Sequence, residues 1–318
     1  MDGVGPGLIT TRPMTVDDVP AVHALGDRYM ARMQGRPFAV TPEGLAAQLD
    51  LPGRELAVDV PVVEIDGRLV AFGSVWAGPP YHEIVMSVLV DDDLDDAAAT
   101  EVRHVLVDAA LGAARHRDLT LGPDPARRAC LVVQEKDSRL AAAAQGTGFA
   151  LERESLLMAI DQRVVTVPDT GWPAGIEVRA VSPDDGPLLA EISRDAFADH
   201  PGDNDFDEEQ MSAYLLEPST RLDLSAVALD AEGPVGMLLC DEQTDGGYVN
   251  MLGVRERGRE RGLGSALLRH AFRVFAAEGR PVVRLHVELD NPTGAVGVYE
   301  SVGMSRAATT QTWTHATS

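Results

Sequence analysis

The sequence predicts an α/β protein made of two tandem copies of one unit, each with a mixed α+β sheet. The chain has 318 residues, which is more than one typical domain holds. Apolar runs with the periods of strands and helices follow one another in the same order twice. Between the two series lies a stretch with four Pro and Gly residues, 161–175, which is typical of a linker. The predicted domains are therefore 1–160 and 176–318.

Turn signals and apolar periodicity define the elements of the first half. Asp66-Gly67 lies between two apolar runs and is a strong hairpin signal. Thr15 is a suitable cap for the helix that follows the first strand. The resulting order is β-α-α-β-β-β-α-β-α-β. Strands are expected at 8–13, 60–65, 69–76, 83–90, 129–133 and 149–160, and helices from 15 onward and at 42–51, 97–115 and 137–144.

The second half repeats this order. Local residues repeat as well, since Arg12 precedes the pair Asp17-Asp18 as Arg179 precedes the pair Asp184-Asp185. Shared element order and local echoes together indicate a tandem duplication. Strands are expected at 176–179, 224–229, 235–240, 248–254, 282–287 and 304–314, and helices at 183–197, 207–216, 265–276 and 293–302.

Composition excludes several classes of protein. The chain has 50 acidic and 27 basic residues and a formal net charge of −23, whereas a nucleic-acid-binding protein would show a basic face. No apolar run reaches the ~20 residues of a membrane span, and the N-terminus lacks the features of a signal peptide. Cys130 and Cys240 lie singly in apolar runs, as buried reduced thiols of a cytoplasmic protein do. No spacing of Cys or His suggests a metal site.

A strand, an arginine-rich turn and a helix follow one another between Tyr248 and Ala276. A helix start offers unbonded N–H groups and the positive end of the helix dipole, so this arrangement favours an anion. Gly262 and Gly264 lack a Cβ, which lets a ligand phosphate approach the backbone closely. Arg259 and Arg261 add forked donors and positive charge.

The motif itself narrows the choice of phosphate ligand. A Walker loop needs Gly-Lys-Ser/Thr, which the chain lacks, and a dinucleotide fingerprint needs a third glycine where Leu267 stands. The remaining pattern, Arg259-x-x-Gly262-x-Gly264, resembles the acetyl-CoA pyrophosphate loop of the GCN5-related N-acetyltransferase (GNAT) superfamily. Downstream, Asn291, Ala295, Tyr299 and Gly303-Met304 resemble the distal motif of that superfamily.

The resemblance covers 176–318 well and 8–160 by element order. It implies two tandem GNAT-type acyl-CoA N-acyltransferase domains, and the tandem layout is similar to that of mycothiol synthase-like bacterial acetyltransferases. The implied cofactor is acetyl-CoA, with its pantetheine arm on one strand and its pyrophosphate on the glycine loop. Asn291 would hold the cofactor or order the strand end, or would only cap the next helix. The implied cofactor-binding residues are Leu252, Gly253, Val254, Arg259, Glu260, Arg261, Gly262, Leu263, Gly264, Ser265 and Asn291.

The resemblance also suggests catalytic residues. Tyr299 is the candidate general acid for a departing thiolate, or else a core aromatic residue. Some members of the superfamily have a Glu five residues before the Asn; His286 stands there and is the candidate base, or else a half-buried structural histidine. Glu288 on the same strand face is the alternative base, and Tyr248 or Glu242 could act through water.

The two copies differ at the loop after the fourth strand. In the first copy this loop, Asp91 to Asp96, has five aspartates and no glycine or arginine, so it would repel a pyrophosphate. The run lacks the glycine and glutamate of a calcium loop, and a solvated loop is expected. The 1–160 domain is therefore predicted to be a degenerate scaffold, and 176–318 the catalytic domain.

The expected activity is direct transfer of an acetyl group to a primary amine of a small acceptor. The carboxylate-rich segment 199–209 could receive a cationic amine, or could be a solvated loop and helix start. A non-catalytic acyl-CoA-binding sensor or scaffold, and a protein N-acetyltransferase, are the alternatives. The acceptor and the oligomeric state stay open at this point.

Overall fold

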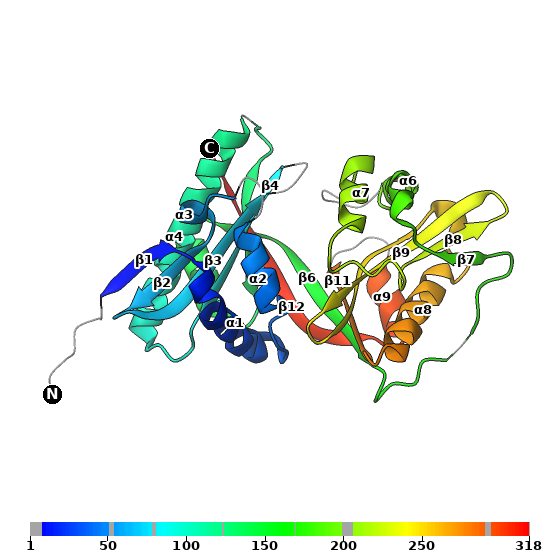
Figure 1. Ribbon diagram of the computed structural model, residues 1–318, viewed down its shortest axis with the longest axis horizontal. Coiled ribbons are helices and arrows are strands. Elements are labelled where there is room, and N and C mark those ends of the chain that lie inside the picture. The colour runs from blue at the N-terminus through cyan, green and yellow to red at the C-terminus, as the bar shows by residue number, and fades with distance from the viewer. Residues whose placement is uncertain are drawn as a thin grey trace. The chain divides into compact units, whose positions relative to one another are not determined.

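The computed structural model describes residues 8–50, 54–77, 81–122, 124–168, 170–198, 206–289 and 294–317 (Figure 1). The chain forms two compact units. The first unit comprises Met1–Ser155 together with Ala308–Ser318, and the second comprises Leu156–Ala307. Within the described ranges, no helix is long and apolar enough to cross a membrane.

The first unit is a mixed sheet with helices on both faces. Its described strands lie in the order β1-β2-β3-β4-β5-β12. Of these neighbours, β4 and β5 pair in parallel and the others pair antiparallel. The elements are β1 (Ile9–Pro13), α1 (Val19–Gln34), α2 (Pro42–Leu49), α3 (Leu56–Asp59), β2 (Pro61–Ile65), β3 (Arg68–Ala77), β4 (Glu83–Val90), α4 (Asp96–Leu121), β5 (Arg128–Gln134), α5 (Ser138–Gly146) and β6 (Ala150–Asp161).

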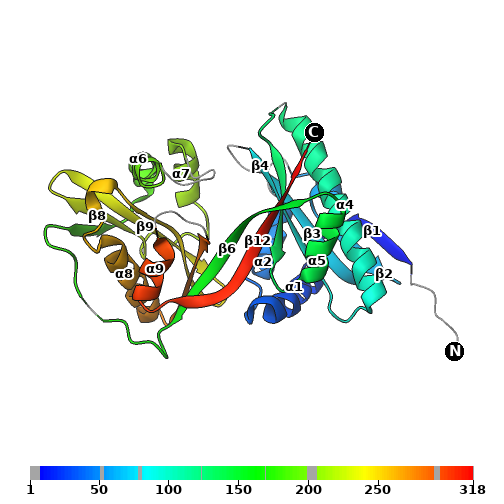
Figure 2. The same ribbon diagram turned by 180° about the vertical axis from the view of Figure 1, so that it is seen from behind.

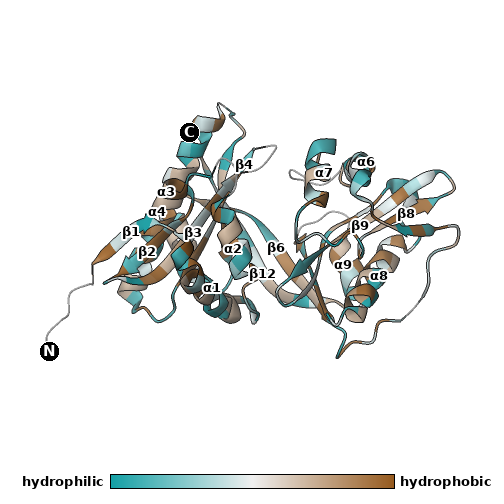
Figure 3. Ribbon diagram, in the orientation of Figure 1, coloured by the Kyte–Doolittle hydropathy of each residue, from teal (hydrophilic) through white to brown (hydrophobic). Residues whose placement is uncertain are grey.

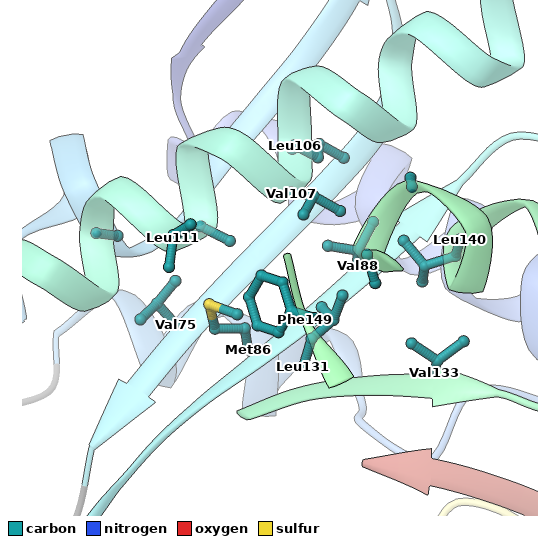
Figure 4. Packing of buried hydrophobic residues seen from close by; sticks show 14 of the residues in the cluster. Val75, Met86, Val88, Leu106, Val107, Leu111, Leu131, Val133, Leu140 and Phe149 are labelled. Atoms are coloured by element: carbon teal, nitrogen blue, oxygen red, sulfur yellow. The ribbon is translucent and has the colours of Figure 1, made fainter. Parts of the chain in front are cut away.

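Two apolar clusters hold this sheet between its helices. On one face, Leu106 and Leu111 of α4 pack with Met86, Leu131 and Phe149 (Figure 4). On the other face, α1 and α2 pack on β2 and β3 around a second cluster. Helices of mixed teal and brown in Figure 3 are the amphipathic ones expected in such a layered fold.

The second unit repeats this architecture, with the order β6-β11-β10-β9-β8-β7. Helix α8 covers one face through Leu267, Phe272 and Phe275, and α6 and α7 cover the other. The elements are β7 (Glu177–Ala180), α6 (Gly186–Ala196), α7 (Glu208–Leu215), β8 (Ala226–Asp230), β9 (Gly233–Gln243), β10 (Gly246–Val254), α8 (Leu263–Ala277), β11 (Val282–Glu288), α9 (Ala295–Ser301) and β12 (Ser305–Ala316).

One local feature shows how closely the units match. Arg12 donates to both carboxylate oxygens of Asp18 at 2.6 and 2.8 Å. Arg179 donates to Asp185 with the same atoms and the same two distances. Each aspartate also accepts from the backbone N–H three residues earlier, which completes a capping box. The predicted α/β fold with its repeated mixed sheet is confirmed.

Two long strands, β6 and β12, belong partly to each unit. Residues 150–155 of β6 lie in the first unit and 156–161 in the second, whereas β12 starts in the second unit and ends in the first (Figure 2). From Thr310 to Ala316, β12 pairs antiparallel with β5. At these two strands the spatial units differ from the predicted domains 1–160 and 176–318. The predicted domain boundaries stay a prediction. The sequence also missed the short helix α3 and ended α4 six residues early.

Candidate functional site

The loop between β10 and α8 leaves the start of α8 open. Gly262 caps the helix with φ +75°, a left-handed conformation that favours glycine, and no side chain caps it. The first intrahelical bond runs from Ala266 N to Gly262 O at 3.0 Å. The N–H groups of 263–265 therefore have no partner among the described residues. A Cβ on Gly262 would meet no atom within 4 Å, so the space beside this capping residue is open.

The two predicted arginines of the loop are held by backbone carbonyls. Arg259 donates to the oxygens of Val254 at 3.3 Å and Ala196 at 3.0 Å, which ties the loop to β10 and α6. Arg261 donates to Ala174 O at 3.1 Å. Between them, Glu260 has φ +60°, which is uncommon for a residue with a side chain and marks a tightly constrained loop.

Strands β10 and β11 separate soon after they begin to pair. Their parallel register contains only two residue pairs, Gly247 with Val283 and Tyr248 with Arg284. Immediately beyond, a β-bulge at Asn250 interrupts the pairing of β10 with β9. A bulge bends its strand and increases its twist, so β10 turns away from β11. The predicted cofactor-contacting residues 252–254 lie on this diverging part of β10.

The bulge leaves Asn250 without a partner residue on either neighbouring strand, because the β11 register has already ended. Sequence reasoning missed this residue. The only sign was one polar residue in an otherwise apolar strand.

His286 lies exposed on β11, on the sheet face opposite α8. Its neighbours Leu285 and Val287 pack into the cluster under α8, so alternation places His286 on the other face. The Tyr248 hydroxyl lies 2.8 Å from His286 Nδ1. If Nδ1–H donates to this hydroxyl, Nε2 is the unprotonated nitrogen and can take a proton. Glu288 is half-buried at the end of the same strand.

Tyr299 lies on α9 and packs against the cluster under α8. Burial raises the pKa of Tyr299 to about 12, so the phenol is protonated at neutral pH. Its hydroxyl makes no hydrogen bond within the described part of the chain. Tyr299 and His286 thus lie on opposite faces of β11. Strand β10 separates from β11 beside them.

Two parts of the predicted site lie outside the described residues. Asn291 is one, and the segment 199–205 of the carboxylate-rich stretch is the other. Within the described part of that stretch, Asp207 caps α7 by accepting from Gln210 N at 2.8 Å. Asp207 therefore has a structural role at the helix start.

Comparison with known proteins relates the second half of the chain to a known family. Residues 188–304 match the acetyltransferase (GNAT) family. Over 298 residues the chain is 28% identical to the mycothiol acetyltransferase of Clavibacter michiganensis subsp. michiganensis, covering 92% of this chain and 90% of that protein. Over 166 residues it is 33% identical to the mycothiol acetyltransferase of Streptomyces scabiei, covering 50% and 53%.

Solved structures share the whole two-unit fold. A GCN5-related N-acetyltransferase from Sphaerobacter thermophilus matches with a TM-score of 0.79 and 21% identity, covering 97% of this chain and 96% of that one. A tandem GNAT protein from the clavulanic acid biosynthesis pathway matches with a TM-score of 0.71 and 17% identity, covering 98% and 99%. The match to the GNAT family thus covers residues 188–304, and the fold of the whole chain is that of the tandem GNAT proteins. The chain is an N-acetyltransferase.

In the first unit of this acetyltransferase, the helix start equivalent to that of α8 is closed. Asp95 caps α4 and accepts from Ala97 N and Ala98 N, both at 3.0 Å. The expectation of a solvated aspartate loop was wrong in part. Asp91 is only 4% exposed and pairs with Arg28 at 3.0 Å, because a buried carboxylate needs a counter-charge.

A buried polar network lies beside the end of β5 in the first unit. The Asp137 carboxylate accepts from Arg103 Nε and from the Tyr29 hydroxyl, both at 3.1 Å. Arg103 and Asp137 are each 1% exposed. A buried network whose members are bonded to one another is rigid.

The two cysteines of the acetyltransferase are free and buried, as predicted. Burial raises the pKa of the Cys130 thiol to about 12, and it also raises the pKa of Cys240. Both thiols stay protonated at neutral pH, which makes them poor nucleophiles.

Proposed function

We propose that this acetyltransferase has one active site, in the second unit, and transfers an acetyl group from acetyl-CoA directly to a primary amine. The observation that carries the proposal is the open start of α8 beside strands that separate. The N–H groups of 263–265 and the helix dipole suit a pyrophosphate, and the empty space at Gly262 admits it. The edge of β10 at 252–254 offers backbone groups to the pantetheine arm.

The catalytic roles follow from the protonation states of the side chains. Acetyl-CoA would supply an activated thioester. Attack by the amine forms the N–C bond of the amide, breaks the C–S bond and releases the CoA thiolate. Tyr299 is protonated at neutral pH and donates its proton to that thiolate. His286, oriented by the Tyr248 hydroxyl, takes a proton from the acceptor ammonium, because only a neutral amine attacks. Glu288 is the alternative base.

We propose a small-molecule acceptor, as the names of the relatives suggest, since they are mycothiol acetyltransferases. The free cysteines support a reducing compartment, the cytoplasm.

The proposal is tested at two glycines that share one conformation. Gly262 and Gly279 stand at opposite ends of α8 with φ +75° and +74°, and a Cβ on either meets nothing within 4 Å. Gly262→Val puts a side chain in front of the open N–H groups. Each lost charge-assisted bond is worth about 1.5–3 kcal/mol, so acetyl-CoA affinity should fall at least ~100-fold.

Gly279→Val carries the same backbone strain without touching the anion site. It should melt at a similarly lowered temperature and bind acetyl-CoA like the wild type in titration calorimetry. Equal affinities of the two variants would refute the assignment of the cofactor loop.

A further inference from the structure

Asp241 differs from the other buried carboxylates of the described chain. Five aspartates there are at most 9% exposed, and four of them pair with an arginine. The four pairs are Asp59 with Arg117, Asp91 with Arg28, Asp137 with Arg103, and Asp185 with Arg179.

Asp241, 8% exposed on β9, has no cationic partner among the described residues. Its carboxylate accepts from two neutral groups, the Tyr214 hydroxyl and Asn250 Nδ2, each at 2.6 Å. The nearby Arg221 pairs instead with Asp223 and Glu242. A buried carboxylate without a counter-charge is costly, and proteins retain one where function requires it.

The position of Asp241 relates it to the reaction. It lies opposite Tyr248 in the β9–β10 register, on the face that carries His286. Asn250, its second donor, is the exposed bulge residue at the point where β10 leaves β11. The Tyr214 donor comes from α7, which covers the same face. Burial and the Asp241 charge raise the pKa of Tyr214, so its hydroxyl remains a donor.

We propose that Asp241 binds a cationic nitrogen of the amine acceptor, which supplies the missing counter-charge. Tyr214 and Asn250 hold the carboxylate in place and leave its remaining lone pairs for the ammonium. The inference rests on the proposed function and adds to it the class of acceptor, a cationic amine that is bound as an ion before it reacts.

The test compares Asp241→Asn with Asp223→Asn. Both remove one negative charge from the same unit, but Asp223 is 62% exposed and lies outside the proposed site. The probes are a panel of diamines, amino sugars and amino-acid amides, each with the counterpart in which hydroxyl replaces the amine. Thermal melting with CoA present reports binding of each probe without turnover.

The wild type should be protected by at least one cationic amine and not by its hydroxyl counterpart. Asp241→Asn should bind that amine about ten- to hundredfold more weakly, while Asp223→Asn keeps wild-type affinity. The proposal is overturned if no cationic amine protects the wild type more than Asp241→Asn. It is also overturned if Asp223→Asn loses the same affinity.

The free protein provides a second readout. Asp241→Asn should melt at or above the wild-type temperature, because it removes an uncompensated charge, whereas Asp59→Asn should melt lower, because Arg117 loses its partner. A comparable loss in both variants would show that Asp241 is already compensated. Acetyl-CoA affinity should be unchanged in Asp241→Asn, so failure here is distinct from failure at Gly262.

Discussion

The starts of α4 and α8 occupy the same place in the two units and differ in what bonds their N–H groups. Asp95 closes α4 with its own carboxylate, and Gly262 leaves α8 open. An aspartate cap and a bound phosphate satisfy the same donors, so a helix start can serve one or the other. The capping residue is thus one of the features that distinguish the two helix starts.

The parallel strands differ in a matching way. In the first unit β4 and β5 stay paired over five residues, from Glu83 to Ser87, and the β3–β4 ladder is regular. In the second unit the pairing stops after two residues, next to the inserted Asn250. A single extra residue in β10 therefore accompanies the opening that the first unit lacks.

The helix beside these strands carries a reversed ion pair. Arg28 and Asp195 lie ten residues after the equivalent Asp18 and Asp185. Arg28 pairs with Asp91 at the end of β4, and Asp195 lies 3.3 Å from Arg255 at the end of β10. Both units keep an ion pair between the helix and the loop. The loop residue is acidic in the first unit, Asp91, and basic in the second, Arg255. Duplicated units can therefore diverge in ligand charge without loss of packing.

The largest expected effect concerns the proposed proton donor. Tyr299 precedes Gly303 by the same spacing as Ala144 precedes Gly148, so the first unit has an alanine at the equivalent position. Tyr299→Phe keeps the packed ring and removes the hydroxyl. It should lower kcat by roughly 100-fold or more with little change in acetyl-CoA affinity. Steady-state kinetics with thiol release measure this. A fully active variant would make Tyr299 a core residue only.

The next prediction concerns the base. His286→Gln should remove the limb of the pH–rate profile of kcat/KM that reports a group near neutral pH, because glutamine does not titrate. Persistence of the limb in His286→Gln and its loss in Glu288→Gln would assign the base to Glu288.

A smaller effect should appear in both units. Hydrogen bonds from Arg12 and Arg179 lower the pKa of Asp18 and Asp185 below the ordinary value. Their stabilisation is present above the unfolded pKa of ~3.9 and is lost as pH falls through the lowered folded value. Asp18→Asn and Asp185→Asn should each cost about 1–3 kcal/mol at pH 7 and progressively less below pH ~4. Denaturant unfolding measures the cost in each variant, and an Asn variant as stable as the wild type would contradict a stabilising role for its capping box.

The smallest expected effect is a null result. Acetyl-CoA should bind with a stoichiometry of one per chain, and Asp95→Gly should leave it at one. Opening the α4 cap restores N–H groups, but β4 and β5 remain paired and the Asp137 network remains in place. A second site in calorimetry of this variant would mean that the cap alone silences the first unit.

The sequence predicted the elements, the duplication and the glycine loop because those depend on local signals. Apolar periodicity predicted the strands, and the glycine at 262 indicated an open helix start. The separation of β10 from β11 could not be predicted, because it depends on a bulge and on register between distant strands. Asp241 was missed for a related reason. Its missing counter-charge is visible only when the neighbours supplied by α7 and β10 are known.

The crossing of β6 and β12 has a consequence for synthesis on the ribosome. The strand that covers the edge of β5 in the first unit is β12, from Thr310 to Ala316, and it follows the whole second unit in the sequence. Until that strand has been synthesised, β5 presents unpaired N–H and C=O groups to any strand nearby. The nascent chain must therefore make the second unit before its first sheet is complete. A chain that stopped before Thr310 would leave that sheet open to aggregation.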